Sequence, residues 1–124
     1  MISDKTVLIV DDASENIAIL GELLSDYNLK VATNGTRALK IVHSGVAINL
    51  ILLDVMMPEM DGFEVARQLK TNPLFASIPI IFLTALSDVH NFIHGFELGA
   101  EEYITKPFDS DAVLRLVQNK LNVE

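Results

Sequence analysis

The segment that most constrains the fold is Leu50–Leu53, four consecutive apolar residues that are followed directly by Asp54. A loop containing Pro58 and Gly62 comes next. A short apolar run closed by such a loop predicts a strand that is buried on both faces. Strands of this kind belong to parallel sheets covered by helices, and ligands bind beyond their carboxyl ends. Asp54 is the first residue past that end, where a carboxylate is poorly placed for packing and well placed for chemistry.

Similar apolar runs predict four further strands, at residues 6–10, 29–32, 78–83 and 102–105. Between and after the strands, apolar residues recur with helical spacing, as in Ile17, Leu20 and Leu24 at i, i+3 and i+7. This spacing predicts helices at 14–27, around 38–42, at 63–71, around 89–96 and around 114–121.

Five strand-then-helix units in 124 residues, without internal linker or repeat, predict a single α/β domain over residues 1–124. Right-handed crossovers give a parallel sheet with helices on both faces. Of the two common doubly wound strand orders, 2-1-3-4-5 fits a chain of this length better. We therefore expect a flavodoxin-like, three-layer sandwich. Because the sequence ends three residues past Leu121, no output domain is expected.

Composition excludes several classes of function. The net charge of −8 disfavours direct binding to nucleic acid or to an anionic membrane. The chain has no cysteine, so it has neither a disulfide framework nor a thiolate metal site. No apolar run approaches the roughly 18 residues of a membrane span, and no signal peptide is evident. These features predict a cytoplasmic protein.

Polar side chains follow four of the predicted strands: Asp11 and Asp12, Asp54, Thr84, and Lys106. In the order 2-1-3-4-5 the first and third strands are neighbours, so the three carboxylates converge. Clustered acids repel one another unless a cation neutralises them, and a small set of oxygen ligands suits Mg²⁺, or Mn²⁺ in its place. A hydroxyl and a lysine beside that cation form a site for a phosphoryl group, with Asp54 as the nucleophile.

The chain resembles the receiver domains of two-component response regulators over essentially its whole length. Four motifs carry the resemblance, one at each of these strand ends: Asp11-Asp12, the segment from Leu53 to Gly62, Leu83-Thr84-Ala85, and the segment from Tyr103 to Phe108. Each motif is weak alone, but their joint presence in this order is highly specific. Asp11-Asp12 in isolation would be better explained as a helix cap, and Lys106-Pro107 as an ordinary turn.

The resemblance implies a role for each matching residue. Asp54 is the expected phosphoacceptor, Asp12 a direct Mg²⁺ ligand, and Asp11 its neighbour acting largely through water. Met56 would add its backbone carbonyl to the metal. In this family the residues two past the phosphoacceptor and two past the threonine flank the approach of the hydrolytic water. Here these are Met56 and Leu86, and both are expected to slow dephosphorylation.

The resemblance also implies a switch. Thr84 and Lys106 match the residues that hold the bound phosphoryl group, and Tyr103 matches the aromatic residue whose rotamer follows the threonine. The peptide bond between Lys106 and Pro107 is typically cis in such domains. A phosphoryl group on Asp54 is expected to change the surface formed by the fourth helix, the fifth strand and the fifth helix.

The implied partners are a sensor histidine kinase or phosphotransfer protein and a downstream effector, with the chain itself a monomer or a weak, phosphorylation-dependent dimer. Two alternatives remain open. One is a phosphorylation-independent interaction module of the same fold. The other is a phosphatase with an aspartate nucleophile, but a haloacid-dehalogenase-like enzyme needs a second aspartate where Met56 stands. His90 and His94 have metal-binding spacing, yet without a third ligand they favour a solvated helix face.

Overall fold

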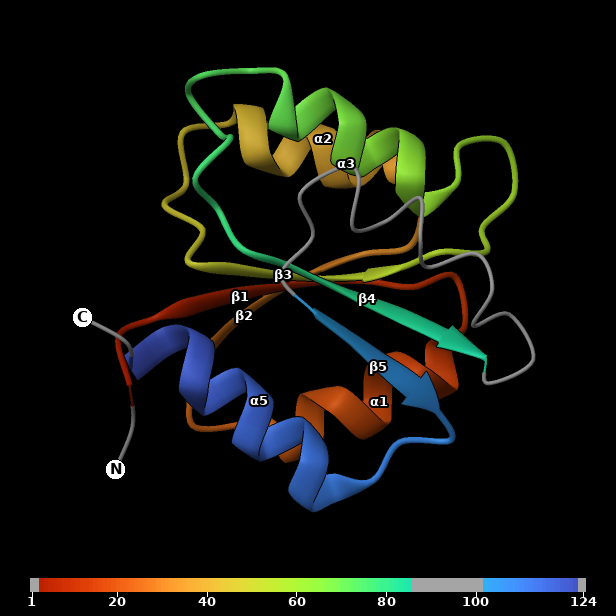
Figure 1. Ribbon diagram of the computed structural model, residues 1–124, viewed down its shortest axis with the longest axis vertical. Helices are drawn as coiled ribbons and strands as arrows, with labels where there is room; N and C mark the ends of the chain where they lie inside the picture. The colour runs from red at the N-terminus through yellow and green to blue at the C-terminus, as the bar shows by residue number, and fades with distance from the viewer. Residues whose placement is uncertain (1–2, 86–101, 123–124) are drawn as a thin grey trace.

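The computed structural model in Figure 1 describes residues 3–85 and 102–122. These residues form five strands and four helices. In chain order they are β1 (Thr6–Val10), α1 (Ser14–Leu23), β2 (Asn28–Ala32), α2 (Gly35–His43), β3 (Leu50–Asp54), α3 (Gly62–Lys70), β4 (Ile80–Ala85), β5 (Glu102–Lys106) and α5 (Ser110–Asn122). The helix predicted around 89–96, with His90 and His94, lies outside the described residues.

The five strands form one parallel sheet in the order β2-β1-β3-β4-β5, which confirms the predicted topology. Strand β3 occupies the middle, with β1 on one side and β4 on the other, and all five of its residues are buried. A strand with both faces covered and both edges paired has to be apolar throughout, which explains the uninterrupted run that precedes Asp54.

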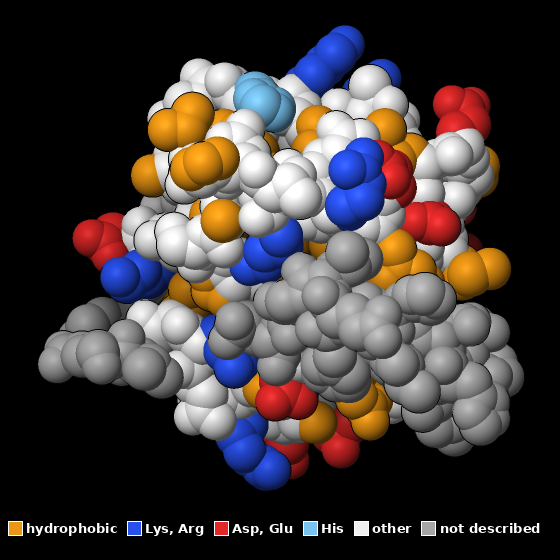
Figure 2. Space-filling model, turned by 45° about the horizontal axis from the view of Figure 1, so that its top comes forward, with side chains coloured by type: hydrophobic (Ala, Val, Ile, Leu, Met, Phe, Trp, Pro, Cys, Tyr) orange, Lys and Arg blue, Asp and Glu red, His pale blue; other side chains and the backbone are white. Residues whose placement is uncertain are grey.

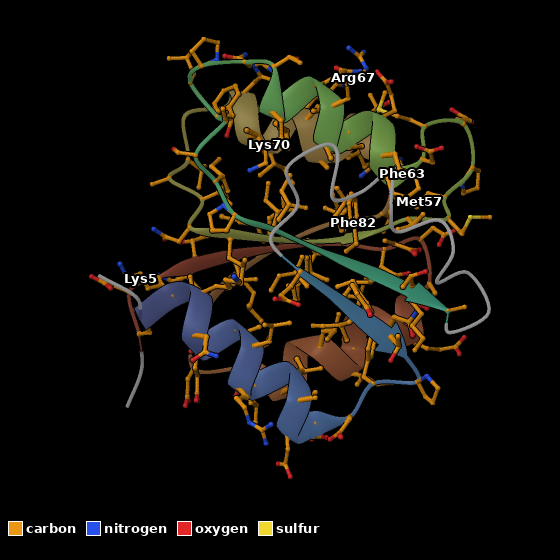
Figure 3. All side chains as sticks on the ribbon, in the orientation of Figure 1. Lys5, Met57, Phe63, Arg67, Lys70 and Phe82 are labelled. Carbon is orange, nitrogen blue, oxygen red and sulfur yellow. The ribbon has the colours of Figure 1, made fainter. Side chains whose placement is uncertain are left out.

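Helices α2 and α3 cover one face of the sheet, and α1 and α5 cover the other (Figure 1). Alternate residues of each strand point into the two layers, as the pleat requires. On the α2/α3 side, Phe82 of β4 packs edge to face against Phe63 of α3 with ring centroids 5.1 Å apart (Figure 3). On the other side, Leu52 and Leu83 pack with Leu20 of α1 and Val117 of α5.

Helices α2 and α3 begin with matching caps. Asn34 accepts a hydrogen bond from the Arg37 N–H, and Asp61 accepts one from the Glu64 N–H. Such side chains satisfy backbone donors that the first helical turn leaves free. On the face that carries these two helices, acidic and basic side chains are interspersed, without a broad area of one sign in view (Figure 2).

Several element boundaries differ from the sequence-based prediction; β3, for example, includes Asp54, and β4 extends to Ala85. Two of these differences have a clear cause. Helix α1 ends at Leu23, not at Tyr27, because the Tyr27 N–H turns back to the Leu24 carbonyl and Asn28 pairs with Lys5. Strand β4 begins at Ile80, not at Ile78. The preceding Pro79 has no N–H for the ladder, and its carbonyl accepts a hydrogen bond from Ile51.

Candidate functional site

The carboxyl ends of the strands bring the chemically active side chains to one edge of the sheet. Val10 of β1 pairs with Leu53 of β3, so Asp11 and Asp54 follow at neighbouring strand ends. Lys106 closes β5, two strands further along the sheet, and its long side chain reaches back to both acids. The topology therefore brings together residues that are up to 95 positions apart, from 11 to 106.

Lys106 forms a bridge between the two buried carboxylates. Its Nζ lies 3.1 Å from Oδ1 of Asp54 and 3.3 Å from Oδ2 of Asp11. Both acids are almost completely buried, at 2% and 0% exposed, whereas about a quarter of the lysine side chain is exposed. One ammonium thus neutralises two carboxylates only in part, and the cluster retains a net negative charge.

Asp11 is held by further donors as well as by the lysine. Its Oδ1 accepts a hydrogen bond of 2.9 Å from the Ala13 N–H, and its Oδ2 accepts one of 3.2 Å from the side-chain amide of Asn16. The first contact forms a turn just before Ala13, the N-cap residue of α1, and it is not a helix cap, because α1 has no side-chain cap hydrogen bond. Asp11 therefore shapes the start of α1 and also takes part in the cluster.

The sequence reasoning missed Asn16. An asparagine in the first turn of a helix is common, and only the turn through Ala13 folds its amide back onto Asp11. The only hint in the sequence was the position of Asn16, five residues after Asp11 and in the first turn of the predicted helix. That spacing alone does not distinguish a solvated amide from a bonded one.

The electrostatics of Asp54 follow from its burial. Burial first, and the Asp11 charge second, raise the pKa of Asp54 from its usual 3.8 to about 6. The Lys106 ammonium and a 3.4 Å hydrogen bond from the Met56 N–H oppose this rise but do not cancel it. The carboxylate is therefore ionised at neutral pH, although its charge is costly without a further cation.

Lys106 shows the complementary effect. Burial acts to lower the pKa of its ammonium, but the Asp54 and Asp11 carboxylates outweigh burial and raise the pKa above its usual value. The lysine consequently stays charged across the physiological range. A permanent positive charge at this position suits the stabilisation of an anionic group beside Asp54.

Asp12 completes a group of three acids. Carboxylate oxygens of Asp11, Asp12 and Asp54 lie within 4.8 Å of one another. Asp12 is exposed and forms no hydrogen bond or ion pair with any residue that the structure describes. An acidic cluster that has one lysine and one carboxylate without a partner among the described residues fits a hard divalent cation such as Mg²⁺.

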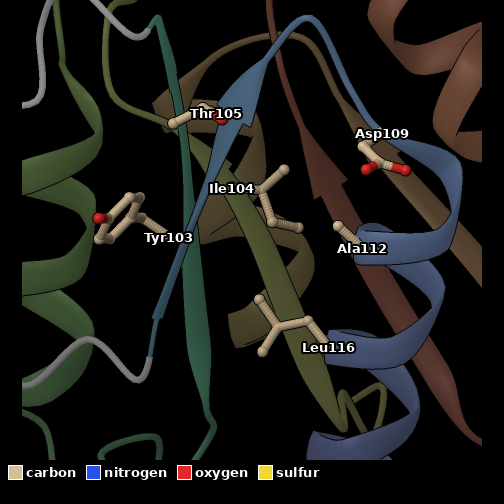
Figure 4. Close-up of a pocket in the computed structure, with 6 residues that line it drawn as sticks. All are labelled: Tyr103, Ile104, Thr105, Asp109, Ala112 and Leu116. Carbon is tan, nitrogen blue, oxygen red and sulfur yellow. The ribbon is translucent and has the colours of Figure 1, made fainter.

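Thr84 and Tyr103 lie on the two strands next to this cluster. Thr84 is buried at the end of β4, and its hydroxyl is 3.4 Å from the carbonyl oxygen of Ala85. Tyr103 is half-buried on β5, where it pairs in register with Phe82, two residues before Thr84. A pocket lies between β5 and the start of α5 (Figure 4). Tyr103 projects to the opposite side of β5 from Ile104, toward α3 (Figure 4).

The remaining predicted site residues have different positions. The backbone N–H of Met56 donates a 3.4 Å hydrogen bond to Oδ1 of Asp54, and the residue is 61% exposed. The Lys106–Pro107 peptide bond is cis. Leu86 lies outside the described residues.

Gly62 controls the loop behind Asp54. Its N–H donates a 2.9 Å hydrogen bond to the Val55 carbonyl, which closes the loop between β3 and α3. A Cβ at this position would lie 2.3 Å from the carbonyl oxygen of Asp54. Only glycine permits so close an approach of α3 to the backbone of the candidate phosphoacceptor. The same loop is shaped by Glu59, which has a positive φ of 69°.

The chain matches the family model described as the response regulator receiver domain over residues 7–118. None of the helices in residues 3–85 and 102–122 is long and apolar enough to cross a membrane.

Among curated proteins, a probable cyclic di-GMP phosphodiesterase of Vibrio cholerae is 47% identical over 86% of this chain and 24% of its own length. A probable transcriptional regulator, ycf27, of Cyanidium caldarium is 42% identical over 92% of this chain and 48% of its own length. Response regulator PleD of Caulobacter vibrioides is 41% identical over 83% of this chain and 23% of its own length. The chain thus spans about a quarter to a half of these relatives.

Solved structures agree with the observed topology. A putative response regulator from Chloroflexus aurantiacus superposes with a TM-score of 0.91 at 32% identity, covering 98% of this chain and 100% of that one. Chemotaxis protein CheY4 of Vibrio cholerae superposes with a TM-score of 0.88 at 28% identity, covering 96% and 100%.

Proposed function

Because the chain belongs to the response regulator receiver family, and is thus a two-component signalling switch, we propose that Asp54 is its phosphoacceptor. The donor is the phosphohistidine of a sensor histidine kinase or phosphotransfer protein, and a small phosphodonor can take its place. In this proposal the chain is the acceptor and assists the transfer; it does not turn over an external substrate.

The observation that carries the proposal is the environment of one carboxylate. Asp54 is buried at the end of the central strand, ionised at neutral pH, and 3.1 Å from a charged lysine. Its neighbours Asp11 and Asp12 have carboxylate oxygens within 4.8 Å. A purely structural role would require none of this, since a buried acid beside other acids destabilises the fold.

The proposed step is a displacement at phosphorus. An oxygen of the Asp54 carboxylate forms the new P–O bond while the P–N bond of the phosphohistidine breaks, and the imidazole nitrogen keeps the electron pair. Lys106 stabilises the charge on the phosphoryl oxygens, and Asp11 and Asp12 would hold Mg²⁺, with the Met56 carbonyl as a further ligand. Bound Mg²⁺ would supply positive charge at the transferring group.

The test is labelling with acetyl phosphate or phosphoramidate in the presence of Mg²⁺, read by intact-protein mass spectrometry. We expect the wild type to gain one phosphoryl group and Asp54→Asn to gain none. The matched control is Asp61→Asn, since Asp61 lies on the same loop and asparagine caps α3 equally well. Labelling of Asp54→Asn at the wild-type level would refute the assignment and would favour an interaction module or another acceptor.

Thr84 and Lys106 are proposed to couple phosphorylation to a surface that includes β5, α5 and the helix predicted around 89–96. A phosphoryl group on Asp54 draws the lysine ammonium and the Thr84 hydroxyl toward it. Space vacated by Thr84 admits Tyr103, which lies one strand away on the same face of the sheet. The pocket between β5 and α5 adjoins this region, so its shape is expected to change with phosphorylation.

We predict that Thr84→Ala still accepts phosphate but transmits a weaker change to Tyr103. Lys106→Ala should uncouple the two more fully, because it removes a charge-assisted contact. The measurement is the phosphorylation-induced NMR shift of the Tyr103 ring in each protein. Shifts of equal size in the wild type and both variants would contradict the coupling.

The lifetime of the phosphorylated state is proposed to depend on Met56 and Leu86. Neither side chain can hydrogen-bond to a water, so neither can orient one for attack on the phosphoryl group. We predict slower dephosphorylation in the wild type than in a Met56→Asn, Leu86→Glu double variant. The rate of dephosphorylation is measured by following the decay of each purified phosphoprotein with Mg²⁺ present. A wild-type rate equal to or above that of the variant would contradict the proposed role of Met56 and Leu86.

The curated relatives are two to four times longer than this chain. We propose that the effector is a protein or domain that reads the surface of β5 and α5. The chain itself would be a monomer or a weak dimer formed on phosphorylation.

A further inference from the structure

We infer that Asn16 is a positioning residue of this site, which holds the Asp11 carboxylate ready for a divalent cation while Lys106 changes partners. This inference rests on the proposed function, because it assigns a role within the same acidic cluster.

The inference starts from the burial of Asp11. The residue has no exposed surface, so its two carboxylate oxygens need hydrogen-bond donors from within the protein. Oδ1 is fixed by the Ala13 N–H at 2.9 Å. Oδ2 receives two side-chain contacts, from the Asn16 amide at 3.2 Å and from the Lys106 ammonium at 3.3 Å.

Of these two donors, the Asn16 amide contacts Asp11 alone, whereas the Lys106 ammonium is shared with Asp54. Lys106 lies 3.1 Å from Asp54 as well, and a phosphoryl group on Asp54 would draw the ammonium toward its own oxygens. Oδ2 of Asp11 would then keep Asn16 as its remaining side-chain donor among the described residues. Without that donor, the buried oxygen would be unsatisfied at the moment when the lysine moves.

The chemistry of the amide also suits this role. A neutral donor orients a carboxylate and leaves its negative charge available to a cation, whereas a second lysine or an arginine would compete with the cation. Donors of this kind, one step removed from the metal, commonly change metal affinity by about 10- to 100-fold when they are removed.

An experiment can distinguish this positioning role from a purely structural role of Asn16. The bond between Asn16 and Asp11 also fastens the first turn of α1 to the end of β1. If anchoring were its whole function, removing the amide would lower the stability of the metal-free protein and leave its affinity for Mg²⁺ unchanged.

The experiment compares Asn16→Ala and Asn16→Leu with the wild type, the leucine variant preserving most of the side-chain volume. Asn28→Ala is the matched control, because its amide donates a bond of the same 3.2 Å length to the Asp4 carbonyl, at the amino end of β2 and away from the carboxyl ends of the strands. Calorimetric titration with Mg²⁺ gives Kd, and urea unfolding in EDTA confirms that each variant is folded. We expect a Kd about 10-fold higher in both Asn16 variants, an unchanged Kd in Asn28→Ala, and labelling that recovers at saturating Mg²⁺.

An unchanged Mg²⁺ Kd in either folded Asn16 variant would overturn the inference, whatever happens to stability. Failure of the wild type to accept phosphate would refute the proposed function instead. The titration would still report on Asn16 in that case, so the two failures are distinguishable.

Discussion

In EDTA at pH 7, the Asp54→Asn variant is expected to be more stable than the wild type by about 2 kcal/mol, or roughly 5–10 °C in Tm. The reason is the cost of ionising a buried carboxylate next to Asp11, which the raised pKa of about 6 expresses. Asparagine has nearly the same shape, keeps an acceptor for Lys106, and carries no charge.

The sign of the pH dependence follows from the same pKa. Between about pH 4 and 6 the folded wild type holds a proton on Asp54 that the unfolded chain has released. The wild type therefore loses stability as the pH rises through this window, and the gap to Asp54→Asn should close at about pH 4. Thermal melts from pH 4 to 7.5 measure this, with Asp26→Asn as a control of equal charge change at an exposed position. A gap that did not vary with pH would contradict the mechanism.

Mg²⁺ should reverse part of this difference. A cation that binds only the folded state stabilises it by about 2.7 kcal/mol at 100 times its Kd. The wild type offers three carboxylates to the cation, whereas Asp54→Asn offers two. We therefore expect a smaller Mg²⁺-induced rise in Tm for the variant, and an equal rise in both proteins would argue against Asp54 as a ligand.

Gly62→Ala is expected to destabilise the protein by about 3 kcal/mol, at the upper end of the cost of forcing an extra methyl group into a packed site. The added Cβ would lie 2.3 Å from the Asp54 carbonyl oxygen, and backbone atoms there cannot rotate away as a side chain would. Relief requires a shift of the loop between β3 and α3, which would also displace Asp54 and slow its labelling.

Gly21→Ala provides the control for this substitution. In α1, a Cβ at Gly21 would meet no atom of the described residues within 4 Å, so alanine should stabilise the helix by about 0.5–1 kcal/mol. Urea denaturation of both variants measures the contrast. Gly62→Ala with the stability of Gly21→Ala would show that the loop adapts without cost.

The strand order and the meeting of four strand ends followed from local patterns, because they depend on burial and on right-handed crossovers. The boundaries of α1 and β4 did not. Helix α1 stops at Leu23 because Asn28 must reach its partner on β1, and helical periodicity carries no information about that pairing.

In the site, too, the sequence predicted which residues meet but not how they contact one another. The sequence placed Asp11 and Asp12 together, but it did not predict their burial, and in the structure Asp11 is fully buried and Asp12 is exposed. The bridge from Lys106 to two acids, and the amide of Asn16 on Asp11, depend on how side chains from separate strands and helices meet. Such contacts are set by tertiary packing, so no window of sequence contains them.

The central position of β3 determines how a signal can leave this protein. The strand is buried along its whole length and hydrogen-bonded to β1 and β4, so it belongs to the part of the fold where local opening is rarest. A phosphoryl group on Asp54, as proposed, would thus be attached to the most protected strand of the sheet. The resulting change would then have to pass between neighbouring strands, from β3 through β4 to the edge strand β5, and not along the polypeptide.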